Sequence, residues 1–266
     1  MAMLRRASMP PCSQRIDKEW LSIMSFLDKL RKKAGRGRPY CSALIAAAGS
    51  SSRMGGENKL LLPLGDRPVI VHTLLAIDAA ESIDEIVIAA REDDLLTFAD
   101  LCKVYGITKP VKVVIGGATR EESVLRAALE ANSEASLLAV QDGARPLVTS
   151  DLIDRTVALA AKCFAAAPAI PVHDTIKVAR DGVVRETPDR STLFAVQTPQ
   201  VFDAGLLKAA LQSALTANVK LTDDCSAVER LGKEVYLTDG SEENIKITTP
   251  VDLVIAEAIL EKREGA

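Results

Sequence analysis

From Tyr40 onward, short apolar runs alternate with amphipathic stretches of helix length, and this alternation restricts the possible folds more than any other feature. The apolar runs span residues 42–48, 85–90, 111–115 and 136–140, and we expect each to form a buried strand. The stretches at 68–80, 93–105, 120–132 and 150–162 predict helices, with Thr119 and Ser150 as N-caps of the last two. Strands and helices at this spacing form crossover units. The sequence therefore predicts an α/β fold, a mostly parallel sheet with helices on both faces.

Residues 173–197 interrupt this alternation. They include a mostly polar pair of strand-like runs around Asp181-Gly182, a turn dipeptide typical of β-hairpins. A polar hairpin covers little core, so we expect it to protrude as an arm, and protruding arms commonly pack on a second subunit. After it, helices are predicted near 203–216 and 224–231, strands near 234–237 and 244–248, and a last helix with Pro250 in its first turn.

Composition excludes several classes of function. Aromatic residues make up only 3% of the chain, too few for a platform that stacks single-stranded nucleic acid. No apolar run approaches the roughly eighteen residues of a membrane helix. Two histidines, His72 and His173, exclude a multi-histidine metal site, and we interpret both as structural or solvent-facing. The five cysteines are an odd number without close pairs, which indicates reduced thiols and a cytoplasmic protein. From the scarce aromatic residues and the absence of a membrane-length apolar run, we expect no nucleic-acid and no membrane partner.

The charge is unevenly distributed. Residues 1–40 contain ten Lys or Arg and three Asp or Glu, a net +7, so the remaining residues carry −10 of the total −3. We therefore divide the chain into a basic N-terminal extension, residues 1–39, and a folded domain, residues 40–266. The extension is predicted to be mobile or one short helix. Contact with an anionic partner and an organellar transit peptide stay open as alternatives to a solvated tail.

Three loops follow predicted strands at the carboxyl edge, where parallel sheets bind ligands. The first, residues 46–59, is rich in small residues and carries Arg53 and Lys59; the others are residues 116–120 and 141–146. Small residues let a ligand approach the backbone, and the two cations suit a phosphate. Neither G-x-G-x-x-G nor a Walker P-loop occurs, which argues against a dinucleotide-dependent oxidoreductase. Alternatively, the first loop is simply solvated, and Asp142 with Arg145 form a structural ion pair.

Seven blocks in these regions resemble those of the 2-C-methyl-D-erythritol 4-phosphate cytidylyltransferase family of the non-mevalonate isoprenoid pathway. They are AAAGSSSRMGGENK, GGATREESV, DGARP, PVHDTIK, QTPQ, TDD and ENIKITTP, in order across about residues 41–262. The resemblance implies an enzyme that transfers CMP from CTP to the sugar-alcohol phosphate, releasing pyrophosphate, with Mg²⁺ as cofactor. It also implies a Rossmann-like nucleotidyltransferase fold and a homodimer joined through the arm at about 173–197.

The matching positions imply roles for individual residues. Catalytic cations at the CTP phosphates would be Arg53, Lys59 and Lys246. CTP would be bound by Ala47, Ala48, Gly49, Gly117, Ser123 and Asp142, and Asp142 would also hold the metal. The sugar-alcohol phosphate would contact Arg145, Thr175, Arg190 and Thr198, with Thr175 and Arg190 reaching the partner subunit's substrate.

The chain departs from the family pattern at two positions. Ala46 stands where the family usually has Pro, and Ala118 where it often has Asp, which puts one side-chain contact to cytosine in doubt. A related acceptor, ribitol 5-phosphate, is the closest alternative, and Lys177 favours methylerythritol phosphate. Asp223 and Asp224 could reach the site, but we interpret them as caps of a helix.

Overall fold

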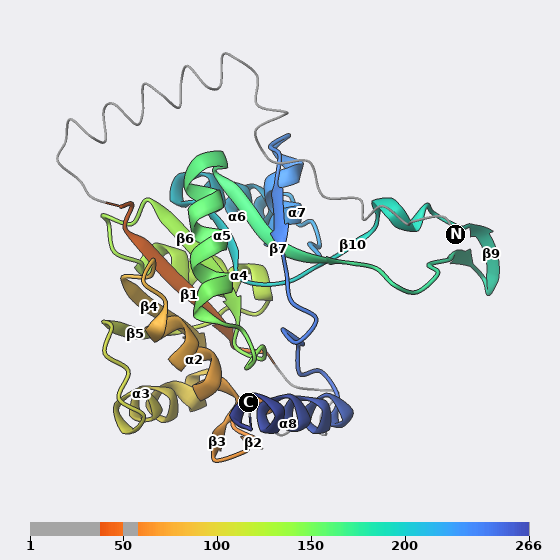
Figure 1. Cartoon of the computed structure of the whole chain (residues 1–266). Coiled ribbons are helices and arrows are strands. Elements are labelled where there is room, and N and C mark those ends of the chain that lie inside the picture. Colours follow the sequence, from red (N-terminus) through yellow and green to blue (C-terminus); the bar gives the residue numbers. More distant parts are fainter. Residues whose placement is uncertain (1–37, 50–57, 266) are drawn as a thin grey trace. The chain divides into compact units, whose positions relative to one another are not determined.

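The computed structural model describes residues 38–49 and 58–265. The predicted N-terminal extension, except Arg38 and Pro39, and the predicted cation Arg53 lie outside these residues. From Pro39 onward the chain is one compact unit, and its main sheet is drawn in Figure 1.

Among the described residues, the main sheet has eight strands in the order β10-β7-β11-β6-β1-β4-β5, with β12 beside β7. Their bounds are β1 Cys41–Ala47, β4 Glu85–Ala90, β5 Val111–Ile115, β6 Leu137–Asp142, β7 Ala165–Pro171, β10 Phe194–Val196, β11 Gln200–Asp203 and β12 Tyr236–Asp239. Strands β1, β4, β5 and β6 pair in parallel, and so do β7 and β12. Only β10 and β11 run antiparallel to their neighbours. The prediction of a mostly parallel sheet is confirmed.

Helices cover both faces of the sheet. One layer holds α2 (Val69–Ala79), α3 (Leu95–Val104), α5 (Ser150–Cys163) and α8 (Pro250–Glu264), and the other holds α4 (Arg120–Glu130), α6 (Ala204–Thr216) and α7 (Asp224–Arg230). Successive strand residues serve alternate layers: Ala43 and Ile45 of β1 join the first core, and Leu44 joins the second. No helix in the described ranges is long and apolar enough to cross a membrane.

The predicted helix starts are nearly correct. The Thr119 side chain caps α4 by accepting a hydrogen bond from the Glu122 amide, as expected. Ser150 is not the cap of α5; the preceding Thr149 has extended backbone and accepts from the Leu152 amide. Two adjacent hydroxyl residues give the same pattern, and only the backbone conformation chooses between them.

The arm is a two-stranded hairpin formed by β8 (Val178–Arg180) and β9 (Val183–Glu186). Asp181 and Gly182 both have positive φ angles, 51° and 75°, as a type I′ turn requires. All residues of both strands are exposed, and Figure 1 shows the hairpin extending away from the sheet. The predicted protruding arm is confirmed as a structural feature, although its strands begin at Val178 and not at His173.

Several parts of the sheet differ from the prediction. Residues 244–248, predicted as a strand, form no regular element, because their polar groups bond to neighbouring loops instead of to a strand. Conversely, β7, β10 and β11 were not predicted as strands, and β10 lies within the residues assigned to the arm. The sequence of β7, AAAPAIP, has one β-branched residue, Ile170, and no aromatic residue, so it lacks the composition typical of strands. Its burial between β10, β11 and β12 makes it a strand.

The remaining short elements are β2 (Pro63–Leu64) paired with β3 (Arg67–Pro68), and the 3₁₀ turns η3 (Glu92–Asp94) and η4 (Arg190–Thr192).

Candidate active site

A cavity of about 360 Å³ opens at the carboxyl edge of the sheet, where β1, β5 and β6 end. It lies where the sequence predicted ligand binding. The predicted residues that line it are Ala48, Gly49, Lys59, Gly117, Ser123, Asp142 and Lys246. The folded chain thus brings together all three predicted loops and the distant segment that contains Lys246.

The loop after β5 lies against the loop after β1. A Cβ atom on Gly116 would lie 2.5 Å from the Cβ of Ala48, so only glycine permits this approach. Ser123 of α4 closes the loop from the other side: its Oγ accepts from the Gly117 amide at 2.9 Å and donates to the Thr119 carbonyl at 2.7 Å. The loop that carries Gly117 is therefore held rigidly beside Ala48.

The backbone amide of Ala118, which precedes α4, is already hydrogen-bonded to a side chain of that helix. It donates to Glu122 Oε2 at 2.8 Å, and Arg126 pairs with the other carboxylate oxygen at 2.6 Å. The backbone hydrogen bond from Ala118, followed by the bond from Arg126, lowers the pKa of Glu122. Glu122 therefore holds this part of the loop.

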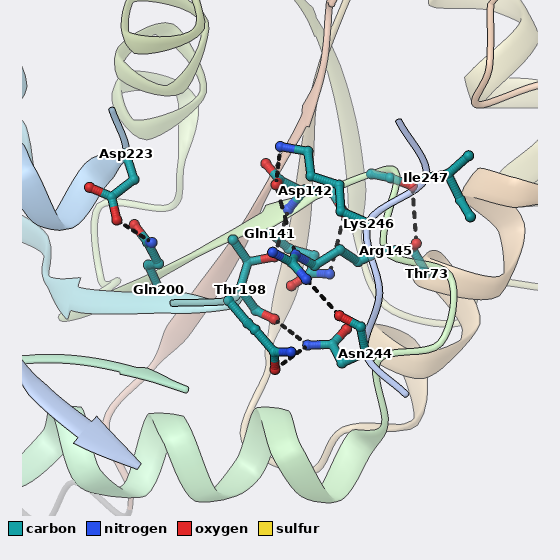
Figure 2. Close-up of polar contacts among 12 residues, drawn as sticks. Thr73, Gln141, Asp142, Arg145, Thr198, Gln200, Asp223, Asn244, Lys246 and Ile247 are labelled. Atoms are coloured by element: carbon teal, nitrogen blue, oxygen red, sulfur yellow. Dashed lines mark hydrogen bonds and ion pairs between the residues drawn. The ribbon is translucent and has the colours of Figure 1, made fainter. Parts of the chain in front are cut away.

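The Asp142 carboxylate, at the end of β6, gathers three cations. Lys246 Nζ lies 2.6 Å from Oδ2, Arg120 Nη2 3.4 Å from Oδ1, and Arg145 Nε 3.9 Å from Oδ2. Figure 2 shows the Lys246 side chain reaching over Asp142. Burial alone would raise the pKa of Asp142, but Arg120 and Lys246 outweigh it and lower the pKa to about 2. The carboxylate is therefore charged at any physiological pH.

Arg120 and Asp224 form an ion pair that the sequence did not reveal. Arg120 Nη2 lies 2.7 Å from Asp224 Oδ2, and Asp224 is fully buried. Burial raises the pKa of Asp224, and Arg120 opposes that increase. Asp223 does cap α7, by accepting from the Ser226 amide, but Asp224 does not. The sequence contained one hint, since two adjacent aspartates cannot both cap a single helix.

Lys59 contacts the segment that carries Lys246. Its Nζ donates to the Ile247 carbonyl at 2.8 Å. The preceding residue, Asn58, donates to Asp94 Oδ2 at 2.9 Å, and its Oδ1 accepts from the Leu60 amide at 3.1 Å. The side chain of Lys59 is thus held by Ile247 and its backbone by the bonds of Asn58. The two predicted lysines therefore lie in one group of connected residues. Asn58 and Asp94, which the sequence pattern did not single out, support Lys59 without lining the cavity.

Three predicted residues lie behind the cavity wall and do not line it. Ala47 is buried in β1. The Thr198 hydroxyl accepts from the Asp142 amide at 3.2 Å, and Arg145 Nη1 donates to the Asn244 carbonyl at 2.6 Å. Both side chains support the residues that do line the cavity.

The two predicted arm residues, Thr175 and Arg190, are exposed and do not line the cavity. Arg190 Nη1 donates to the His173 carbonyl at 2.6 Å at the base of the arm.

The other candidates have structural surroundings. His72 Nε2 lies 2.8 Å from the Leu64 carbonyl, and His173 pairs with Glu242 at the surface. Burial raises the pKa of the Cys225 thiol, which is consistent with an inert side chain.

We expect Asp142→Asn to remove part of the acid sensitivity of folding. The unfolded side chain has a pKa of 3.8 and the folded one about 2. Between these values the unfolded chain binds more protons, so the contribution of Asp142 is complete above about pH 4 and is lost as the pH falls towards 2. The wild type should lose about 2 kcal/mol more than the variant over this range.

Urea unfolding at pH 5, 4, 3 and 2.5 measures this difference. Asp93→Asn, at an exposed aspartate of η3, is the matched control and should change with pH as the wild type does. If the free energy of unfolding fell equally with pH in the wild type and in Asp142→Asn, the lowered pKa assigned to Asp142 would be wrong.

The chain is similar to known proteins over most of its length. Residues 41–262 match the family model described as IspD, 2-C-methyl-D-erythritol 4-phosphate cytidylyltransferase. The protein of that name from Bacillus cereus is 45% identical over 218 residues, which cover 82% of this chain and 96% of the relative. Its namesake from Syntrophotalea carbinolica is 46% identical over 222 residues, covering 82% and 95%.

Solved structures give the same result. The 4-diphosphocytidyl-2C-methyl-D-erythritol synthase of Anaerococcus prevotii superposes with a TM-score of 0.77 at 32% identity, covering 84% of this chain and 96% of that one. The 2-C-methyl-D-erythritol 4-phosphate cytidylyltransferase of Thermus thermophilus gives 0.67 at 32% identity, covering 83% and 98%. On the extent of the family match and the identity of these relatives, the chain belongs to the 2-C-methyl-D-erythritol 4-phosphate cytidylyltransferase family.

Proposed function

We propose that the cavity at the carboxyl edge of the sheet is the site at which this enzyme performs the reaction of its family. The enzyme transfers CMP from CTP to 2-C-methyl-D-erythritol 4-phosphate, which gives 4-diphosphocytidyl-2-C-methyl-D-erythritol and pyrophosphate. The observation that carries the placement is the pair of lysines, Lys59 and Lys246, beside the glycine-rich loops of one cavity.

The chemistry explains the need for these cations. An oxygen of the acceptor phosphate attacks the α-phosphorus of CTP, the new P–O bond forms, and the bond to pyrophosphate breaks. Both reactants are anions, so repulsion is the first obstacle. A phosphate monoester is already ionised, so no covalent enzyme nucleophile is needed, and the protein must neutralise charge and align the groups. We assign this work to Lys59 and Lys246, together with Arg53, which lies outside the described residues.

The cytidine end is assigned to the loops beside the lysines. Ala47 ends β1, Ala48 and Gly49 follow it, and the loop of Gly117, held by Ser123, lies next to Ala48. Such loops offer backbone amides and carbonyls to a base. Because Ala118 has no polar side chain and its own amide donates to Glu122, recognition there falls to the other backbone groups of the loop.

Mg²⁺ is assigned to Asp142. In nucleotide enzymes Mg²⁺ commonly takes one or two carboxylates and completes its shell with water and substrate phosphates. Asp142 fits this donor set, since it is ionised and lines the cavity, while the described residues contain no cluster of three or more His, Cys, Asp or Glu side chains. The ion would supply further neutralisation of the CTP phosphates.

The sugar-alcohol phosphate is assigned to Arg145 and Thr198 near Asp142, and to Thr175 and Arg190 on the arm. A homodimer in which each arm reaches the partner's cavity would explain why the two arm residues are exposed and do not line the cavity of their own subunit. The exposed apolar side chains Val178, Val183 and Val184 on the arm would be covered by such a partner. Reduced cysteines favour a cytoplasmic location, which stays a prediction.

Pyrophosphate release with CTP and Mg²⁺ tests the acceptor. We expect turnover with 2-C-methyl-D-erythritol 4-phosphate and little with ribitol 5-phosphate, because the relatives compared above are named for the first acceptor. Turnover with ribitol 5-phosphate alone would keep the mechanism and refute the assigned substrate.

Lys59→Ala and Lys246→Ala should each lower kcat by about 10²–10³, in line with removal of one electrostatic group that touches the transition state. Steady-state kinetics measure the loss, and circular dichroism checks the fold. Lys233→Ala, at an exposed lysine away from the cavity, is the matched control and should retain kcat. Near wild-type turnover in both site variants would refute the assignment.

Arg190→Ala should mainly raise KM for the acceptor, since a guanidinium suits phosphate recognition.

Mixing Arg190→Ala with Lys246→Ala subunits tests whether the arm acts across a dimer. If it does, each mixed dimer has one intact site, and at an acceptor concentration far below the raised KM of Arg190→Ala the mixture regains about a quarter of the wild-type turnover. No recovery after confirmed subunit exchange would mean that the arm serves its own subunit.

A further inference from the structure

Lys246 belongs to a segment with no regular backbone structure. Residues 240–248 lie between β12 and α8 and contain no helix or strand. A lysine in such a segment has no ladder of backbone hydrogen bonds to fix it, so other contacts must set its position. A displacement of about 1 Å at a reacting group can reduce the rate on the order of 10²-fold.

Asn244, two residues before Lys246, is fully buried and joins three loops (Figure 2). Its Nδ2 donates to the Thr198 carbonyl at 3.0 Å and to Gln197 Oε1 at 3.3 Å. Its backbone carbonyl accepts from Arg145 Nη1 at 2.6 Å. One residue therefore connects the segment of Lys246 to the loop after β10 and to the loop after β6.

Gln197 and Ile247 complete the attachment. Gln197 is buried; its Nε2 donates to the Ser241 carbonyl at 2.8 Å, and its Oε1 accepts from the Ser241 amide at 3.2 Å. On the far side of Lys246, the Ile247 amide donates to the Ala144 carbonyl at 2.8 Å. Hydrogen bonds thus attach the segment to neighbouring loops at Ser241, Asn244 and Ile247. Of these, the bonds of Asn244 are the closest to Lys246 on its N-terminal side.

The chemistry of this contact requires an amide. The Asn244 nitrogen faces two oxygen acceptors, the Thr198 carbonyl and Gln197 Oε1. An amide nitrogen has two hydrogens to give them, whereas an ionised carboxylate has none. Aspartate, which has nearly the same size and shape, would therefore place a third acceptor against the other two in a buried position.

We propose that Asn244 is a positioning residue: through the hydrogen bonds of its side-chain amide to Thr198 and Gln197, it places Lys246 over Asp142 in the cavity. This inference rests on the proposed role of Lys246 in phosphate-charge neutralisation. Asn244 itself touches no reacting atom and acts through Lys246.

A double-mutant cycle tests the proposal. The variants are Asn244→Ala, Asn244→Asp, Lys246→Gln and the double variant Asn244→Ala/Lys246→Gln, in the full chain with CTP, Mg²⁺ and 2-C-methyl-D-erythritol 4-phosphate. Both Asn244 variants should lower kcat by about 10–100-fold, while KM for CTP changes by less than about 3-fold. In the Lys246→Gln background, Asn244→Ala should cost less than about 3-fold more, because the residue it positions is already gone.

The matched control is Asn132→Ala. Asn132 Nδ2 bonds to the Tyr40 hydroxyl, in contacts away from the cavity, so this variant should lose stability without a change in kcat. Thermal unfolding separates folding from catalysis, and Asn244→Asp preserves the test if Asn244→Ala does not fold.

Three outcomes are decisive. Loss of kcat in the Asn244 variants, with the non-additive cycle, supports the proposal. Wild-type kcat in a folded Asn244 variant, or losses that multiply in the double variant, would overturn it and leave the role of Lys246 intact if Lys246→Gln is impaired. Wild-type kcat in Lys246→Gln would refute the proposed function of Lys246 and this inference with it.

Discussion

The site depends on the ion pairs that the charged Asp142 carboxylate makes with its neighbours. Asp142 is a single carboxylate at the end of β6, and Lys246, Arg120 and Arg145 reach it from three separate parts of the chain. Three cations so close together would repel one another without it. The carboxylate thus allows an enzyme for anionic substrates to concentrate positive charge at the edge of its sheet and remain folded.

The cation cluster is asymmetric, and the asymmetry separates structural from reactive charge. Arg120 is paired with the fully buried Asp224 as well as with Asp142, so two carboxylates of the fold already neutralise its charge. Arg145 is nearly buried and gives one hydrogen bond to the backbone of Asn244. Lys246 is the most exposed of the three, at 38%, and it lines the cavity. Under the proposed function, Lys246 would be the cation of the three that shares its charge most readily with an incoming phosphate, because Arg120, which also lines the cavity, is paired with two carboxylates.

The arm differs from the rest of the domain because it has no apolar core. The cavity is built within one compact unit, whose core is apolar on both faces of the sheet. The hairpin has no core of its own, and its apolar side chains Val178, Val183 and Val184 are exposed. The turn at Asp181-Gly182 makes it a regular element even so, because its backbone angles match the twist of the paired strands.

Much of the architecture could be predicted from the sequence alone. Periodicity located β4 and β5 at their observed bounds and α2, α4, α5 and α6 within two residues, because burial on one or both faces imposes a repeating pattern on the chain. The glycine-rich blocks likewise placed Lys59, Gly117 and Asp142 at one edge of the sheet, since parallel strands end together.

Only the tertiary structure decided the contacts that hold the site in place. Lys59 donates to the carbonyl of a residue 188 positions away, and Arg145 to one 99 positions away. Such bonds have no period and no local motif, so residues 244–248 resembled a strand and Asp224 resembled a cap. What the sequence by itself determined was which residue types would meet at the edge of the sheet. The folded chain decided which of them pair, because hydrogen bonds depend on positions in space that the spacing along the chain does not encode.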